Sequence, residues 1–331
     1  MTADVGRVSD FLLELYRDAR QQRPDVFQRN ILAHLRQFVP FDFGAWGGGA
    51  QDSREVSEVI MLDQSPGLFR DWSAVAEIDG YCDLALRRLN HTVLFDDIPD
   101  FRESTAYKEH WRRFDARQMV STIMAEPTDG YVSFVGLCSA DINRRFSESE
   151  RAVKQMLMPH VSSALHLSRE NQVVEAKMTD EGVGMVTSTG MILASRMPFM
   201  HLVRDEWGHS YPDTLAAILP TGPGGGVWRG RSIQLRIERM GPYFLLRARP
   251  RNHLDVLPPR AQQVAEHFGR GMTHKEVART LSIAPSTVRN QLAQIYDKLG
   301  IGDKGELARL VATADGLRRK PCQRPEHKPT T

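Results

Sequence analysis

The chain has 331 residues, of which 41% are hydrophobic and 25% are charged, and its formal net charge is +2. This length is enough for two or three domains that each bury a core, and the composition is that of an ordinary globular protein. No run of about 18 apolar residues occurs and no basic-then-apolar leader follows Met1, so we expect no membrane span, no signal peptide and a cytoplasmic location.

The first half of the chain predicts a domain that mixes helices and strands. Apolar residues at helical spacing predict helices over 6–20 and 24–38, and the segments 41–49 and 56–62 predict two strands joined by a turn. Further helices are expected over 67–78, 81–89 and 104–114, followed by a hairpin of 119–125 and 131–138. This order predicts an α+β domain with helices on one face of an antiparallel sheet.

A long helix follows this domain. Ser147-x-x-Glu150 is a capping box, and the helix that it opens reaches about Glu175 with Val153, Leu157 and Val161 facing inward. We expect it to cover the domain, which then spans residues 1–175, and to serve as a dimer or coupling helix. Residues 101–141 and 146–170 resemble the GAF-like sensor half of many LuxR-family regulators, a resemblance that implies architecture rather than a ligand.

Residues 176–250 predict a smaller α+β domain. Gly182–Val186 and Met191–Ala194 flank Thr189-Gly190 as a hairpin, and helices are expected over 198–207 and 212–219. Apolar residues alternate with polar ones over 233–238, which predicts a half-buried strand paired with 243–248. Strands, helices and a final hairpin in this order resemble a short PAS-like fold.

Residues 251–314 predict an all-α domain of four helices. In its third helix, one apolar stripe is formed by Val288, Leu292, Ile295 and Leu299. The opposite face carries polar and small side chains, namely Ser286, Arg289, Asn290, Ala293, Gln294 and Asp297. Pro285 fits the first turn of this helix and Gly300 fits a left-handed cap at its end. The preceding helix, 274–281, is separated from it by three residues, which predicts the sharp crossing of a helix-turn-helix whose second helix enters a major groove.

The spacing of these residues resembles the LuxR-type DNA-binding domain of bacterial regulators. The matching pattern is Leu257-x-x-Arg260, Gly271-x-Thr273-x-Lys275-Glu276-Val277-Ala278, Leu281-x-Ile283, Thr287-Val288-x-Asn290, Ile295-x-x-Lys298-Leu299-Gly300-Ile301 and Glu306-Leu307. The resemblance implies that Thr273, Lys275 and Thr287 hold phosphates and that Arg289 and Asn290 read base edges. Ser286, Gln294 and Lys298 complete the predicted DNA contacts. The fourth helix is expected to dimerise through Leu307, Leu310 and Val311.

The sequence also departs from that pattern at four positions. They are Ala284 for a capping Ser, Ala261 for a common Glu, Gln291 for a frequent His, and Ala293 for a residue that is often basic. Ala293 removes one expected contact with DNA. Readout then depends on Arg289, which suits a guanine edge, on Asn290, which suits adenine, and on Gln294.

Charge supports the same assignment. Residues 251–331 contain 14 Lys and Arg against 8 Asp and Glu, whereas residues 1–250 contain 29 against 33. The basic excess lies on the predicted DNA-binding end, as phosphate binding requires. The tail 315–331 has no apolar period, so we expect it to be disordered and to add non-specific attraction to phosphates.

A ligand pocket is expected in the first domain. Its predicted residues are Trp46, Trp72, Asp79, Tyr81, Trp111 and Phe134, with Asp79 available to fix a polar group of a small organic ligand. The alternative is that these aromatic residues only form the core of the domain, as aromatic residues usually do.

No other chemistry is indicated by the motifs. Five histidines, His34, His91, His110, His160 and His166, lack H-x-x-H spacing, and Cys82, Cys138 and Cys322 form no C-x-x-C pair. We therefore expect reduced thiols, no metal and no cofactor. Asp96-Asp97 lacks the later residues of a phosphoacceptor domain, the glycine clusters at 182–184 and 224–226 do not form a nucleotide-binding loop, and no paired nucleophile and base indicates an enzyme.

The sequence thus predicts a regulator that binds double-stranded DNA as a homodimer and is controlled by a signal, such as a small-molecule ligand, in its N-terminal domains. The alternative is a ligand-independent regulator whose N-terminal domains only dimerise or bind another protein. The residues leave both open.

Overall fold

The computed structural model describes residues 5–128, 130–176, 181–222 and 224–319. Its N-terminal domain is built on a five-stranded antiparallel sheet. The strand order is β2-β1-β5-β4-β3. The strands are β1 (Phe43–Ala50), β2 (Val56–Leu62), β3 (Thr92–Leu94), β4 (Gln118–Ala125) and β5 (Tyr131–Ser139). The α-helices are α1 (Val5–Gln21), α2 (Pro24–Leu35), α3 (Gly67–Trp72), α4 (Gly80–Arg87), α5 (Thr105–Glu109) and α6 (Glu148–Glu175). Short 3₁₀ helices link them, η1 (Ala76–Ile78), η2 (Phe95–Asp97), η3 (Phe101–Glu103) and η4 (Trp111–Phe114). The expected strands and hairpins are confirmed, and the short edge strand β3 is an addition.

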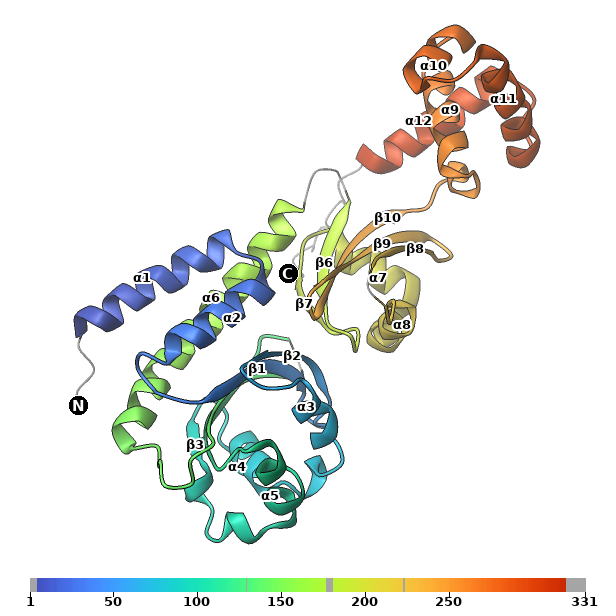
Figure 1. The fold of residues 1–331 in the computed structure, drawn as a ribbon. Coiled ribbons are helices and arrows are strands. Elements are labelled where there is room, and N and C mark those ends of the chain that lie inside the picture. Colours follow the sequence, from blue (N-terminus) through green and yellow to red (C-terminus); the bar gives the residue numbers. More distant parts are fainter. Residues whose placement is uncertain (1–4, 129, 177–180, 223, 320–331) are drawn as a thin grey trace, which may run out of the picture.

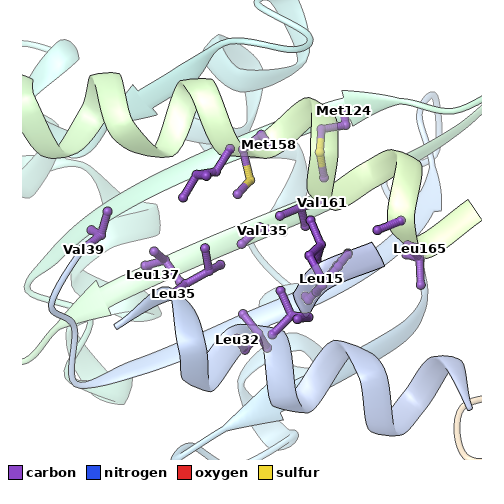
Figure 2. Packing of buried hydrophobic residues seen from close by; sticks show 14 of the residues in the cluster. Leu15, Leu32, Leu35, Val39, Met124, Val135, Leu137, Met158, Val161 and Leu165 are labelled. Atoms are coloured by element: carbon purple, nitrogen blue, oxygen red, sulfur yellow. The ribbon is translucent and has the colours of Figure 1, made fainter. Parts of the chain in front are cut away.

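Helices cover both faces of this sheet, so the prediction of helices on one face was wrong. On one face Val135 and Leu137 of β5 pack with Leu32 of α2 and Val161 of α6, as Figure 2 shows. On the other face Val132 and Cys138 of β5 pack against the short helices α3 to α5. The sheet needs helices on both faces because its strand β5 is buried along both sides, and its apolar residues do not alternate with polar ones.

The long helix α6 begins as its sequence predicts and links two domains. Ser147 Oγ accepts a hydrogen bond from the backbone N–H of Glu150, and the Glu150 carboxylate accepts from the N–H of Ser147 at 2.8 Å. The helix then runs from the first sheet toward β6 and β7 of the next domain (Figure 1). Its last turns contribute Val173 to the core of that domain.

The central domain contains a second five-stranded antiparallel sheet, in the order β7-β6-β10-β9-β8. Its elements are β6 (Gly182–Val186), β7 (Ile192–Ser195), α7 (Phe199–Trp207), η5 (Gly208–Ser210), α8 (Tyr211–Ile218), β8 (Gly226–Arg229), β9 (Ile233–Met240) and β10 (Tyr243–Pro250). Both expected hairpins are confirmed, and β8 is an additional strand that the sequence pattern did not indicate. Helices α7 and α8 cover one face, and the end of α6 covers part of the other.

The C-terminal domain is helical, as predicted. It consists of η6 (His253–Val256), α9 (Pro259–Gly269), α10 (His274–Leu281), α11 (Pro285–Leu299) and α12 (Lys304–Arg319). The expectation of disorder from residue 315 was wrong for 315–319, because α12 continues through them after Val311 and Ala314 enter the core. The remainder of that predicted tail, 320–331, lies outside the described residues. None of the helices in the described part of the chain combines the length and apolar character that a membrane span requires.

Candidate nucleic-acid interface and ligand pocket

Contacts with neighbouring elements of the C-terminal domain fix where α10 ends and α11 begins. Arg260 of α9 donates a hydrogen bond to the carbonyl of Leu281 at the end of α10. The next residue, Ser282, adopts the left-handed conformation, with φ 53° and ψ 47°, which ends α10 abruptly. Gly300 ends α11 in the same way, with φ 63° and ψ 37°, as its sequence predicts.

The loop before α10 is held from the opposite side. Lys304 Nζ donates to the carbonyls of Gly271 at 3.1 Å and Met272 at 3.2 Å. The same ammonium lies 4.4 Å from the centroid of the Phe268 ring, a favourable cation–π distance. The first helix of the motif is thereby fixed against α9 and α12.

The two faces of α11 separate as its sequence predicts. Val288, Leu292 and Ile295 are buried in the core of the domain, and Leu299 is half-buried. The predicted DNA contacts on the outer side are all exposed, namely Ser286, Thr287, Arg289, Asn290, Gln294 and Lys298. None of these six side chains has a hydrogen bond or an ion pair with any other residue that the structure describes. They are free to bind an external partner.

A cavity of about 100 Å³ lies in the N-terminal domain, between its sheet and helices α3 and α4. The lining is almost entirely apolar. The predicted pocket residues Trp72, Tyr81, Trp111 and Phe134 line it together with Asp79. Residues that the sequence analysis did not include also line it, among them Met61, Phe69, Cys82, Met119 and Cys138.

Trp46 was wrongly assigned to this pocket. Its side chain lies on the other face of the sheet, fully buried in the core beneath α1, α2 and α6, and its ring lies 5.9 Å from that of Phe27. The residues around Trp46 in β1 are mostly glycines, which have no side chains, so the sequence shows no alternation from which the face of Trp46 could be predicted.

Asp79 organises the wall of the cavity. Its Oδ2 accepts hydrogen bonds from the indole N–H groups of Trp72 and Trp111, each at 2.9 Å. Its Oδ1 accepts from the backbone N–H groups of Tyr81 at 3.0 Å and Cys82 at 3.4 Å, which caps α4. Burial raises the pKa of Asp79 despite these four donors. A carboxylate has about four acceptor positions, so all are occupied.

The thiols and histidines near the cavity are inert in this arrangement. Burial raises the pKa of Cys82 to about 12 and raises the pKa of Cys138 further. Burial also lowers the pKa of His110 to about 4, so its imidazole is neutral at physiological pH. No cluster of three His, Cys, Asp or Glu side chains among the described residues could hold a metal ion.

Comparison with known proteins concerns mainly the C-terminal helices. Residues 255–311 match the family model described as bacterial regulatory proteins, luxR family. The C-terminal domain is a LuxR-family helix-turn-helix domain. The transcriptional regulatory protein UhpA of Escherichia coli strain K12 is 33% identical over 98 residues, which cover 30% of this chain and 44% of UhpA. ComA of Bacillus subtilis strain 168, also a transcriptional regulatory protein, is 33% identical over 63 residues, 19% of this chain and 29% of ComA. The chain thus spans less than half of the curated relatives that it matches.

Solved structures give weaker likenesses to the rest of the chain. The VqsR LBD domain from Pseudomonas aeruginosa has a TM-score of 0.39 at 20% identity and covers 49% of this chain and 96% of that one. Escherichia coli SdiA has a TM-score of 0.36 at 11% identity and covers 95% of this chain and 100% of that one. Scores at this level do not establish a shared fold, so the GAF-like and PAS-like resemblances of the N-terminal and central domains remain predictions.

Thr273 and the predicted dimer residues serve the LuxR-family domain itself. Thr273 Oγ1 accepts a hydrogen bond from the N–H of Glu276 at 3.3 Å, and the Glu276 carboxylate accepts from the N–H of Thr273 at 2.7 Å.

Leu307 and Val311 are buried within the domain, so their assignment to a dimer surface was wrong. Leu310 is half-buried and is the one predicted dimer residue whose side chain stays partly exposed.

Proposed function

We propose that this chain is a transcription regulator that binds double-stranded DNA through α11, with affinity set by a small uncharged ligand in the N-terminal cavity. The observation that carries the DNA-binding part is the outer face of α11. Its polar side chains are exposed and have no partner in the part of the chain that the structure describes, directly opposite a stripe that the domain buries. Protein surfaces that read base edges in the major groove have this arrangement of side chains.

In this proposal the residues of the motif have different roles. Arg289 and Asn290 contact base edges, and Gln294 extends that contact along the groove. Lys275 and Thr287 contact phosphates, whereas Thr273 fixes the start of α10 through its capping box. Two copies bind one site, because a single helix of this length contacts only a few base pairs.

The ligand is expected to be largely apolar. The cavity exposes hydrophobic side chains, and the acceptor positions of Asp79 are filled by two indoles and two backbone N–H groups. A charged ligand would lose its hydration for few polar contacts there, because nearly all of the exposed lining is apolar. Native mass spectrometry of gently purified protein tests this point: a defined small adduct supports a ligand, whereas a clean mass favours the ligand-independent regulator.

The DNA-binding part is tested by selecting the preferred site from a random duplex library and then measuring affinity for single-base variants. We expect Arg289→Ala to reduce discrimination at one base pair by about 1–3 kcal/mol. The matched control is Arg204→Ala, which removes the same charge from an exposed position of α7 in the central domain. Equal loss on the selected site and on random DNA would contradict base reading by Arg289.

A further inference from the structure

A group of buried charged side chains lies where the N-terminal domain meets the central domain. Arg169 of α6 is 1% exposed, and its guanidinium faces two buried carboxylates. Nη1 lies 3.5 Å from Glu126 Oε2, and Nη2 lies 3.8 Å from Glu58 Oε1. Burial of three such charged groups is costly unless each has compensating partners.

Each carboxylate is also held by other polar side chains of the sheet or of α6. Tyr131 donates its hydroxyl to Glu58, and Ser57 Oγ donates to the same carboxylate at 2.5 Å. Glu126 accepts from Ser133 and lies 2.9 Å from His166 Nε2. Gly48 leaves the space for this arrangement, since a Cβ there would lie 2.0 Å from the Tyr131 hydroxyl.

The pKa values of the two carboxylates differ because of these partners. Burial raises the pKa of Glu58, against the attraction of Arg169. Burial would also raise the pKa of Glu126, but the hydrogen bond from His166 and the charge of Arg169 outweigh it and leave that pKa below its ordinary value.

The same guanidinium reaches the central domain. Its Nη2 lies 3.4 Å from the hydroxyl of Tyr243, and its central carbon lies 5.5 Å from the centroid of the Tyr243 ring. Tyr243 is fully buried at the start of β10 and donates its hydroxyl to Gln28 Oε1 of α2 at 2.7 Å. Arg169 therefore joins strands of one domain to the first residue of a strand in the other.

Glu58 and the hydroxyl donors to the two carboxylates alternate along their strands with residues on the cavity side. On β5, Tyr131 and Ser133 face Arg169, while Val132 and Phe134 line the cavity. On β2, Glu58 directly precedes Val59, which packs with residues of the cavity wall. Side chains one apart on a strand point to opposite faces, so any strand movement caused by filling the cavity also moves the partners of Arg169.

The path continues toward the DNA-binding domain. Strand β10 runs from Tyr243 to Pro250, and near its end Arg249 Nη1 lies 2.9 Å from Asp255 Oδ2. Asp255 belongs to η6, whose Leu254 is in the core of the LuxR-family domain.

We propose that Arg169, through its contact with Tyr243, is a positioning residue that couples filling of the N-terminal cavity to the geometry of β10. The inference rests on the proposed function in that it gives the route by which a ligand would change DNA affinity. It goes beyond that function in naming the contact that carries the change.

The test uses the full chain and replaces the unidentified ligand by a side chain. Gly136→Val adds an isopropyl group to the cavity at a position where a Cβ meets only Ser121 Cβ, at 3.9 Å. Hydrogen exchange of β10 is then compared with and without this change, in the natural background and in Tyr243→Phe. Tyr243→Phe removes the hydroxyl but keeps the buried ring, and Tyr211→Phe of α8 is the matched control.

We expect Gly136→Val to change the protection of β10 amides by about two- to tenfold, the equivalent of one hydrogen bond. In Tyr243→Phe this response should fall below about twofold, whereas Tyr211→Phe should keep it. A residue with a purely structural role would lower protection equally with and without Gly136→Val. Should Gly136→Val fail to fold, Ala85→Val fills the cavity from α4.

A response that persists in Tyr243→Phe, or that is absent with Tyr243 in place, would overturn the coupling. DNA affinity of the same samples separates this from failure of the proposed function. An exchange response without any DNA binding would remove the proposed function and leave the coupling supported.

Discussion

The N-terminal and C-terminal domains use the same types of side chain in opposite ways. Arg169 is buried between two carboxylates and a tyrosine. Arg289 is exposed on α11, and no described residue forms an ion pair or a hydrogen bond with its side chain. In the first domain these buried polar groups bind one another and define how parts of the chain are joined. In the second they remain available for an external partner, which is what a binding surface requires.

The largest expected difference in the free energy of unfolding is between Arg169→Met and Arg289→Met, the same substitution in the two domains. Arg169→Met leaves Glu58 and Glu126 buried without their guanidinium, so we expect the free energy of unfolding to fall by about 3–5 kcal/mol. Arg289→Met changes an exposed position and should alter it by less than about 0.5 kcal/mol. Urea denaturation of both variants measures the difference. Similar small effects would mean that the buried cluster is better hydrated than its burial indicates.

The two domains also differ in how far their sequences predicted them. The apolar stripe and the polar face of α11 could both be predicted, because one helix has one buried stripe and its period of 3.6 is visible in the sequence. Trp46 was placed on the wrong face because β1 is buried on both sides and its glycines hide the alternation. The roles of Glu58 and Arg169 could not be predicted, since their partners lie 111 positions away and meet only when α6 crosses the folded sheet.

A second prediction concerns the wall of the cavity. Asp79→Ala removes the acceptor of two indole N–H groups and the cap of α4, so we expect a loss of about 2–4 kcal/mol in the free energy of unfolding. Asp83→Ala, on the same helix, breaks only a partly exposed pair with Arg54 and should cost less than about 1 kcal/mol. Tryptophan fluorescence during denaturation follows both. If Asp79→Ala were no more damaging than Asp83→Ala, Asp79 would not organise the wall.

A third prediction uses pH. The pKa of His110 is lowered by burial to about 4 in the folded chain, so between that value and its ordinary pKa of 6.5 the unfolded chain binds more protons. The contribution of neutral His110 to the free energy of unfolding is therefore complete above pH 6.5 and decreases as the pH falls below that value. From pH 7 to pH 5 we expect this histidine to contribute a loss of about 1–2 kcal/mol. His110→Phe should reduce the pH dependence by that amount, and His91→Phe, at an exposed position, should leave it unchanged.

The smallest effect should come from comparing two lysines. Lys275 is exposed at the start of α10, whereas Lys154 is fully buried in α6 and donates to Thr122 Oγ1 at 2.6 Å and to the carbonyl of Val135 at 3.0 Å. Burial lowers the pKa of Lys154 well below its ordinary value, and the buried amine is not accessible to a phosphate. A lysine that neutralises one phosphate contributes about 0.9 to the slope of log affinity against log salt. Lys275→Ala should therefore reduce the magnitude of that slope by about 0.9 and weaken binding to all sequences alike. Lys154→Met should leave the slope unchanged whatever it does to stability. An equal change in both variants would mean that lysines influence DNA binding through the fold rather than through phosphate contact, and α10 would then not lie along the backbone.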